Sequence, residues 1–382
     1  MLVTYAAPTA VYIHIPFCTN KCHYCDFNSY VLKGQPVMAY LDALEREMAL
    51  TVRQHPPHKV ETIFVGGGTP TVLLPHQMER FLRMVRTYFP VDAEVEFSME
   101  ANPGTTDEDK LAVMKEGGVN RISFGVQSFN NDILAAIGRI HNTDDVHRSI
   151  ANAKKLAFDN LSIDLMFGLP KQTVDIMQAT LDEALSLDLQ HYSIYSLKVE
   201  ENTLFHTLFN KNQLPLPSED EEVEMYELIM RRLESAGYKQ YEISNFARPG
   251  RESRHNTMYW RNRSYYGLGA GAHGYIDGLR HINIKGVQPY IDATEKGLPI
   301  LETNEVSPQE AMEDFMMVGL RLMEGVRNAD FIAQFGTTIE SQFGETLQGW
   351  LKKKLLEQTT DGYRLSKQGI LLGNEVFASF LS

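Results

Sequence analysis

The only three cysteines of this 382-residue chain, Cys18, Cys22 and Cys25, lie within eight residues of one another. An odd number of thiols so close together makes a poor disulfide framework, so we interpret them as metal ligands. Three thiolates on one short loop suit a [4Fe-4S] cluster in which one iron stays open for an external ligand. The spacing therefore predicts an iron-sulfur centre with a free coordination position, where chemistry can take place.

A structural zinc site is the alternative for the same three thiols. Zinc normally takes four ligands, and His14, His23 and Asp26 are the nearby candidates for the fourth. Such sites are usually completed by a second pair of cysteines, and the sequence has no second pair. This favours the iron-sulfur cluster over zinc, and an absorption spectrum of the purified protein distinguishes the two.

Six β-rich segments alternate with helical segments in the first half of the chain, in repeats of roughly 30 to 40 residues. Such repeats indicate right-handed βαβ crossovers and a parallel sheet, either open and doubly wound or closed toward a barrel. Six units predict an α/β fold with a partial (βα)6 barrel over about residues 8–200. The predicted strands are Val11–Ile15, Glu61–Val65, Glu94–Met99, Arg121–Phe124, Leu161–Met166 and His191–Leu197.

Glycines and polar residues cluster where these predicted strands end. Gly66–Pro70 follows the second strand, Glu100 and Asn102 follow the third, Gly125–Gln127 follows the fourth, and Asp164 lies in the fifth. In barrels of parallel strands the site forms at the carboxyl ends of the strands. We therefore expect these segments to meet the cysteine loop at one mouth.

The chain divides into three predicted regions. Residues 1–235 form the barrel, residues 236–300 a polar and aromatic connecting region, and residues 301–382 a small, mainly helical, winged-helix-like domain. Ser307–Glu310 has the pattern of a capping box with proline at the first helical position, so we expect it to open a helix that runs to about Met323.

Composition and charge exclude several classes of protein. The chain has 36 Lys and Arg against 49 Asp and Glu, a net charge of −13, which repels phosphate backbones and anionic lipid. We therefore expect no nucleic acid partner and at most peripheral membrane association. No segment reaches about 18 consecutive apolar residues, and the first residues lack a signal-peptide pattern, so we expect a cytoplasmic protein.

The cysteine spacing resembles the signature of the radical S-adenosylmethionine (SAM) superfamily. Further motifs, spread over essentially the whole chain, resemble the oxygen-independent coproporphyrinogen oxidase family within it. These motifs are Tyr12–Cys18 (YIHIPFC), Gly66–Thr71 (GGGTPT), Gly125–Phe129 (GVQSF), Gly138–Arg139 and Asp164–Pro170 (DLMFGLP).

The resemblance implies that SAM chelates the open iron through its amino and carboxylate groups, and that an electron from the cluster cleaves its sulfonium to give a carbon radical. The residue types agree, because glycines let a backbone approach a cofactor closely, and carboxylates hydrogen-bond ammonium or hydroxyl groups. A guanidinium offers a fork to a carboxylate. The residues implied for the cofactor site are Tyr12, Tyr24, Gly67, Gly68, Thr69, Glu100, Gln127, Arg139 and Asp164.

Two features point to one branch of that family. The decarboxylating oxidases carry a fourth cysteine two positions after the third, where this chain has Phe27, and they carry a long amino-terminal extension, whereas this chain reaches its first predicted strand after about ten residues. Both features resemble the paralogous haem-chaperone branch. That resemblance implies a protein that binds haem and passes it to apoproteins such as respiratory cytochromes; porphyrinogen decarboxylation is the alternative. The sequence identifies neither the electron donor nor the haem acceptor.

A second motif of this branch is HNxxYW, which begins at His255. A neutral imidazole is a good iron ligand, and Tyr259 and Trp260 have aromatic faces that suit a porphyrin. We therefore expect His255 to be the axial haem ligand, with His273 and His281 as the next candidates. No Cys-x-x-Cys-His run occurs, so covalent c-type attachment is not expected.

Overall fold

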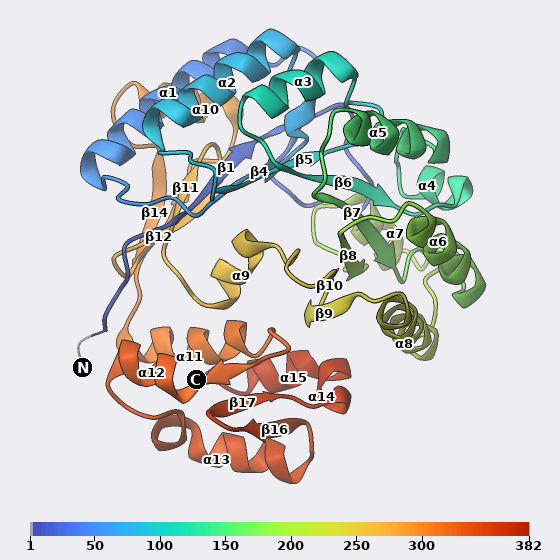
Figure 1. Cartoon of the computed structure of the whole chain (residues 1–382), viewed down its shortest axis with the longest axis vertical. Helices are drawn as coiled ribbons and strands as arrows, with labels where there is room; N and C mark the ends of the chain where they lie inside the picture. Colours follow the sequence, from blue (N-terminus) through green and yellow to red (C-terminus); the bar gives the residue numbers. More distant parts are fainter. Residues whose placement is uncertain (1–2, 382) are drawn as a thin grey trace.

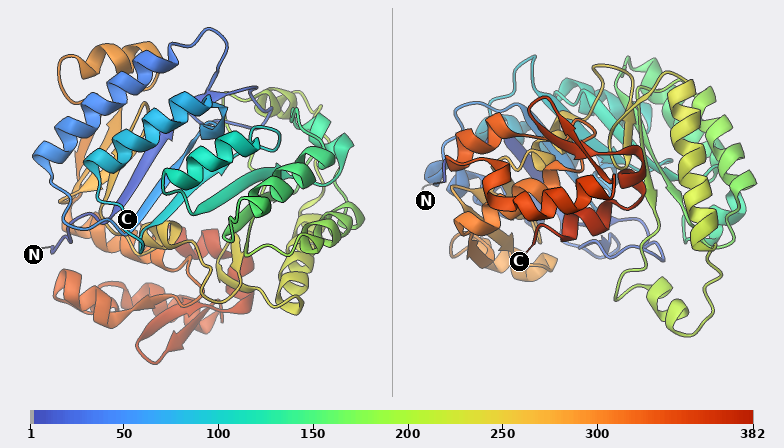
Figure 2. Two further views of the ribbon diagram at one scale, coloured as in Figure 1. Left: turned by 45° about the horizontal axis from the view of Figure 1, so that its top comes forward. Right: turned by 90° about the horizontal axis from the view of Figure 1, so that it is seen from below.

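The computed structural model describes residues 3–381, and its centre is a twelve-stranded sheet in the order β14-β13-β12-β11-β1-β4-β5-β6-β7-β8-β10-β9. The six predicted strands are present, pair in parallel and run consecutively through its middle. The sheet curves into an open arc, as the views in Figures 1 and 2 show, so the predicted partial barrel is confirmed. The six strands are β1 (Ala10–Ile15), β4 (Thr62–Gly67), β5 (Glu96–Ala101), β6 (Arg121–Gln127), β7 (Leu161–Phe167) and β8 (His191–Ser196).

Amphipathic helices cover the convex face of the arc (Figure 1). The helix that begins at Pro75 is an example, because Met78, Phe81, Leu82 and Val85 recur at helical spacing and are buried. These apolar stripes pack on the sheet and form one continuous core with its outward-facing side chains. The covering helices are α1 (Val37–Gln54), α2 (Pro75–Tyr88), α3 (Glu108–Glu116), α4 (Asn131–Ala136), α5 (Thr143–Lys155), α6 (Val174–Ser186), α8 (Glu219–Ser235) and α10 (Val287–Thr294).

Residues 236–300 do more than connect the barrel to the last domain. They add strands to both edges of the six-stranded core, and β11 pairs in parallel with β1 in the register Ala10↔Tyr265. Sequence reasoning missed these strands because they are short and rich in polar and aromatic residues. The domain boundaries given above stay a prediction. The added strands are β9 (Lys239–Glu242), β10 (Asn245–Ala247), β11 (Tyr265–Leu268), β12 (His273–Ile276) and β13 (Leu279–Asn283). The edge strand β14 (Ile300–Glu305) extends the same sheet from the first residues of the predicted carboxyl-terminal domain.

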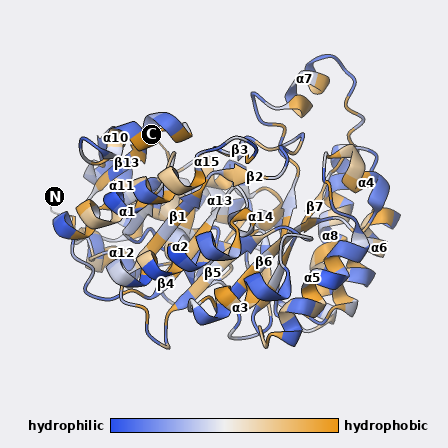
Figure 3. Cartoon of the chain, turned by 90° about the horizontal axis from the view of Figure 1, so that it is seen from above, coloured by the Kyte–Doolittle hydropathy of each residue, from blue (hydrophilic) through white to orange (hydrophobic). Residues whose placement is uncertain are grey.

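One short helix, α9 (Arg254–Trp260), lies on the concave side of the arc, between the sheet and the carboxyl-terminal domain (Figure 1). Ser253 caps it by accepting a hydrogen bond from the backbone N–H of Asn256. Another short helix, α7 (Leu204–Asn210), projects from the rest of the molecule in Figure 3. Helix α9 carries the HNxxYW motif.

The carboxyl-terminal domain has a hydrophobic core of its own. The predicted capping box is present, since Ser307 accepts from the backbone of Glu310 and the Glu310 side chain accepts from the backbone of Ser307; the helix ends at Gly319, four residues before the expected end. Its helices and antiparallel three-stranded sheet agree with the expected winged-helix-like arrangement. The elements are α11 (Pro308–Gly319), β15 (Val326–Arg327), α12 (Asn328–Phe335), α13 (Ile339–Lys352), β16 (Leu356–Thr359), β17 (Gly362–Leu365), α14 (Lys367–Leu371) and α15 (Gly373–Ala378).

Within residues 3–381, no helix combines the length and the apolar character that crossing a bilayer requires.

Candidate functional site

The three cysteines lie on a loop that leaves the carboxyl end of β1. Two short parallel strands, β2 (Phe17–Cys18) and β3 (Tyr30–Val31), pair with each other and hold the two ends of this loop together. The backbone N–H of Phe205 in α7 donates to the carbonyl of His23 at 3.0 Å, which fixes the middle of the loop from outside. All three thiols are free and half-buried, so they are available as ligands at the mouth of the barrel.

The cysteine loop and the ends of β4 to β7 enclose a cavity of about 120 Å³, here called the cysteine cavity. It contains side chains from every strand end that the sequence analysis selected, as expected for parallel strands whose carboxyl ends meet at one mouth. The predicted site residues that line it are Cys18, Cys22, Tyr24, Cys25, Gly67, Gly68, Thr69, Glu100, Gln127, Arg139 and Asp164.

The glycines at the end of β4 make room for protein atoms, which differs from the reason that the sequence suggested. A Cβ on Gly67 would lie 2.2 Å from the His14 ring, and Gly67 has a φ of 102°, in the region that disfavours side chains. A Cβ on Gly68 would lie 2.6 Å from the carbonyl oxygen of Phe17. Gly67 is therefore needed for the close packing of the end of β4 against β1, and Gly68 for packing against the start of the cysteine loop, whatever a cofactor requires.

Arg139 ties the cysteine loop to the strand ends. Its Nη1 donates to the Cys22 sulfur at 3.4 Å, its Nη2 donates to Asn102 Oδ1 at 2.7 Å, and Nη2 also donates to the carbonyl of Gly125. The thiolate is the form of cysteine that binds iron. The guanidinium thus supplies positive charge at the place where a cluster would carry negative charge.

Asn102, which the sequence analysis placed at the mouth after the third predicted strand but did not assign to the cofactor, is part of the site. Its Nδ2 donates to Thr69 Oγ1 at 2.8 Å, and Thr69 Oγ1 in turn donates to the Cys18 sulfur at 3.7 Å. Burial raises the pKa of the Cys18 thiol. Binding of iron at Cys18 therefore requires the thiol to release its proton. The neighbouring hydrogen-bond donors offset part of the free-energy cost of that release.

Two half-buried carboxyl groups line the cysteine cavity. Glu100 Oε2 accepts from the backbone N–H of Gly67 at 3.0 Å, and Asp164 Oδ1 accepts from Ser123 Oγ at 2.9 Å. Burial, with the nearby charge of Asp164, raises the pKa of Glu100 to about 8, and burial also raises the pKa of Asp164. An arriving cation would lower both pKa values, so this pair of carboxyls suits an ammonium group.

Gln127 enters the cavity through an irregularity in the sheet. Its φ is 71°, unusual for a residue other than glycine, and the register between β6 and β7 shifts between Gly125 and Gln127. A bulge of this kind redirects a side chain at the end of a strand, and bulges are frequent beside active sites.

A second cavity of about 350 Å³, here called the mouth cavity, adjoins the cysteine cavity and shares Phe27, Gly67 and Glu100 with it. The predicted site residue Tyr12 lines this second cavity. Phe27, which stands where the oxidases have a fourth cysteine, is 63% exposed and lies between the two cavities. The other lining residues are His14, Asn28, Tyr259, Tyr265, Gly271, His273 and Lys285.

His255 lies in neither cavity. It is 1% exposed, its Nδ1 is hydrogen-bonded to Thr62 Oγ1 at 2.9 Å, and its Nε2 is hydrogen-bonded to the Tyr259 hydroxyl at 2.9 Å. The ring stacks on Phe64 at a centroid distance of 5.2 Å, and burial lowers its pKa to about 3. The structure therefore places the histidine of the motif beneath the mouth, with both ring nitrogens engaged, and not in the polar surroundings that the sequence suggested.

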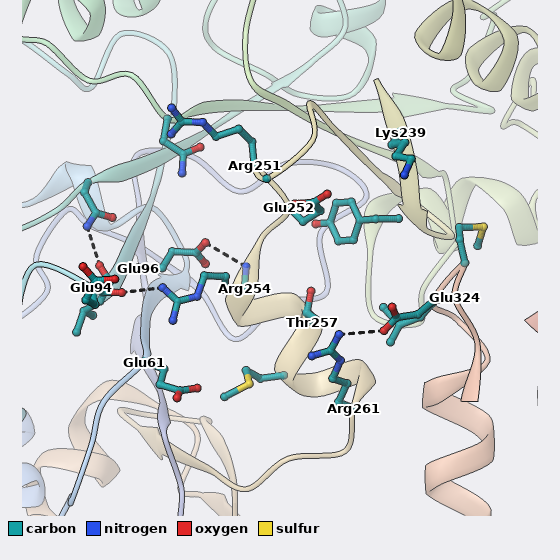
Figure 4. A pocket seen from close by; sticks show the side chains of 18 of the residues that line it. Glu61, Glu94, Glu96, Lys239, Arg251, Glu252, Arg254, Thr257, Arg261 and Glu324 are labelled. Atoms are coloured by element: carbon teal, nitrogen blue, oxygen red, sulfur yellow. Dashed lines mark hydrogen bonds and ion pairs between the residues drawn. The ribbon is translucent and has the colours of Figure 1, made fainter. Parts of the chain in front are cut away.

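A cavity of about 990 Å³ lies where the first residues of the strands face the carboxyl-terminal domain (Figure 4). Three of its arginines have partners among the residues that line it. Arg254 donates to the carbonyl of Glu94 at 2.7 Å, and Arg261 pairs with Glu324 at 2.9 Å. None of the site residues predicted from the sequence lines this cavity.

Comparisons with known proteins agree with the resemblance found in the motifs. Residues 12–184 match the Radical SAM superfamily, and residues 306–372 match the HemN C-terminal domain. The heme chaperone HemW of Bacillus subtilis (strain 168) is 46% identical over 374 residues, which cover 97% of this chain and 99% of the relative. The heme chaperone HemW of Escherichia coli (strain K12) is 36% identical over 385 residues, 98% of each chain.

The fold also matches a solved structure of a coproporphyrinogen III oxidase, HemN from Escherichia coli. The TM-score is 0.86, and the match covers 98% of this chain and 90% of that one. The sequence identity is 24%, so this likeness concerns the fold alone. It confirms the predicted barrel together with its carboxyl-terminal domain.

Proposed function

The chain belongs to the HemW family within the radical SAM superfamily, and on that premise we propose that it is a haem chaperone, which binds haem and delivers it to apoproteins. The observation that carries the proposal is the similarity over nearly the whole length to relatives named heme chaperones, 46% identical in the first case. Phe27 agrees with it, because the fourth cysteine of the oxidases is absent.

We propose that Cys18, Cys22 and Cys25 hold a [4Fe-4S] cluster and that SAM completes it. The donor set fits, because three free thiols line one cavity beside the guanidinium of Arg139. When bound, the cluster and SAM together supply the one-electron cleavage of the SAM sulfonium. The protein holds the thiols in place, and the half-buried carboxyls of Glu100 and Asp164 provide a floor that takes up positive charge from the cofactor.

The haem is proposed to bind between the HNxxYW helix and the mouth of the barrel. The expectation that His255 ligates its iron requires the Tyr259 hydroxyl to leave the ring nitrogen, since the two are hydrogen-bonded at 2.9 Å. The acceptors are proposed to be apoproteins of respiratory haem enzymes, such as cytochromes. The proposed location is the cytoplasm, with at most peripheral attachment to a membrane, because the net charge of −13 repels anionic lipid.

The test is a comparison of two substrates with one preparation of protein. Protein reconstituted anaerobically with iron and sulfide is incubated with SAM and a reductant, first with coproporphyrinogen and then with haem. We expect saturable haem binding, transfer to an apo-cytochrome, and no protoporphyrinogen. Steady formation of protoporphyrinogen would show that the protein is an oxidase and not a chaperone. A colourless protein that retains zinc would refute the assignment of the iron-sulfur cluster.

A further inference from the structure

The side chains of the HNxxYW motif point to three different places. His255 is buried below the mouth, and Trp260 packs under the guanidinium of Arg321, whose carbon lies 4.5 Å from the centroid of the Trp260 ring. Of the three aromatic side chains of this motif, only Tyr259 lines the mouth cavity. In the folded motif, the Tyr259 ring is therefore the aromatic surface that a haem in the mouth cavity would contact. The His255 imidazole holds Tyr259 in place through the hydrogen bond to its hydroxyl.

Another histidine does reach the mouth cavity. His273 begins β12, its side chain is exposed, and its ring lines the cavity beside Lys285. Within residues 3–381 its ring nitrogens have no hydrogen-bond partner, in contrast to His14, whose two nitrogens bond to the Tyr12 hydroxyl at 2.9 Å and the Asn28 carbonyl at 2.8 Å. Burial and the charge of Lys285 lower the pKa of His273, so the ring is neutral and keeps a lone pair for a metal.

The rest of the cavity suits a flat, anionic macrocycle. Phe27 projects at its edge, and Tyr259 and Tyr265 pack edge to face at a centroid distance of 4.7 Å along its wall. Lys285 is an exposed cation on the same wall. Aromatic faces stack on a porphyrin, and an ammonium group pairs with a carboxylate such as a haem propionate.

We propose that His273 ligates the iron of a haem that binds in the mouth cavity, and that Lys285 pairs with one of its propionates. The proposal rests on the function proposed above and names the residue that would bind the haem iron. It places the haem directly beside the cysteine cavity, because the two cavities share Phe27, Gly67 and Glu100.

The cavity of about 990 Å³ beside the carboxyl-terminal domain is the competing location for haem. It could hold a larger ligand, and Met258 and Met323 bring thioether sulfurs to it, but no histidine lines it among the described residues. Its cations Arg254 and Arg261 already have partners, as Figure 4 shows. Lys239 also lines this cavity and has no ion-pair partner among the described residues, so the missing histidine is what disfavours haem iron there, and Met258→Leu serves as the variant that tests this cavity.

The experiment measures the binding of ferric haem to the reconstituted full-length protein by absorption and electron paramagnetic resonance spectra. We expect His273→Gly to weaken haem binding about tenfold or more, which corresponds to at least ~1.4 kcal/mol, and to lose the spectrum of a histidine-bound iron. Added imidazole should restore that spectrum, which a merely structural role of His273 would not allow. His76→Ala, an exposed histidine on α2, is the matched control and should bind as the wild type does.

The remaining variants separate the possible outcomes. Lys285→Met should weaken binding severalfold and reduce its dependence on salt, because one screened charge pair is lost. An unchanged spectrum and affinity in His273→Gly would overturn the proposal while leaving a haem-binding protein, and so would a spectral change in Met258→Leu instead. Failure of the wild type to bind haem would overturn the proposed function itself.

Discussion

Replacing Gly67 with alanine should destabilise the barrel more than its small size suggests. Gly67 ends β4 at a φ of 102°, and an added Cβ would lie 2.2 Å from the His14 ring. The His14 ring cannot move away from the added methyl group without losing a hydrogen bond, because one ring nitrogen bonds to the Tyr12 hydroxyl and the other to the Asn28 carbonyl. The methyl group therefore has to displace either the ring and its hydrogen bonds or the end of the strand.

The magnitude follows from two costs. An alanine at positive φ loses about 1–2 kcal/mol relative to glycine. Forcing a methyl group into a packed site costs a further 1–3 kcal/mol or so, through shifted side chains or broken hydrogen bonds. The free energy of unfolding should therefore fall by about 2–5 kcal/mol, a large fraction of the roughly 5–15 kcal/mol typical of a folded domain.

The assay is urea denaturation of the cluster-free protein, followed by circular dichroism. Gly34→Ala is the matched control, since Gly34 also has a positive φ of 81° but nothing lies within 4 Å of the added Cβ. The control should lose only the backbone cost of about 1–2 kcal/mol. If Gly67→Ala loses no more free energy than Gly34→Ala, the contact with His14 does not explain the glycine.

Cys22→Ser should abolish retention of iron and sulfide while the far-ultraviolet circular dichroism stays unchanged, because the ligand lies on a loop outside the core; full iron and sulfide content would refute the ligand set. Glu100, whose pKa is raised from 4.5 to about 8, stabilises the fold only while it is protonated, so its contribution is fully present below about pH 4.5 and is lost as the pH rises through 8. The cluster-free wild type should therefore lose a few kcal/mol relative to Glu100→Gln between about pH 5 and about pH 9, and parallel pH profiles would contradict this. Arg139→Met should leave Asn102 Oδ1 without a donor, lower the free energy of unfolding by about 1–3 kcal/mol and speed cluster loss under chelation; a cluster as durable as in the wild type would count against the role of the guanidinium.

The sequence determined the parts of the protein whose signals are local. The cysteine spacing, the alternation of strand and helix and the Ser307–Glu310 capping box depend on residues within a few positions of one another. They can therefore be recognised without knowledge of the fold. One general rule, that parallel strands place their carboxyl ends together, then predicted that Glu100 and Asp164 would lie near the thiols, and the family resemblance added Arg139. The structure confirms that they line one cavity with the cysteines.

Only the tertiary structure decided which atoms meet across long distances in the chain. The pairing of Ala10 with Tyr265 joins residues more than 250 positions apart, and the contact of Gly67 with His14 depends on the packing of two strand ends. Such contacts have no sequence signature, because they arise from the closure of long loops and the fit of a whole core. The same packing buries His255 and brings His273 into the mouth cavity, although both histidines stand in similarly polar, aromatic stretches of the sequence.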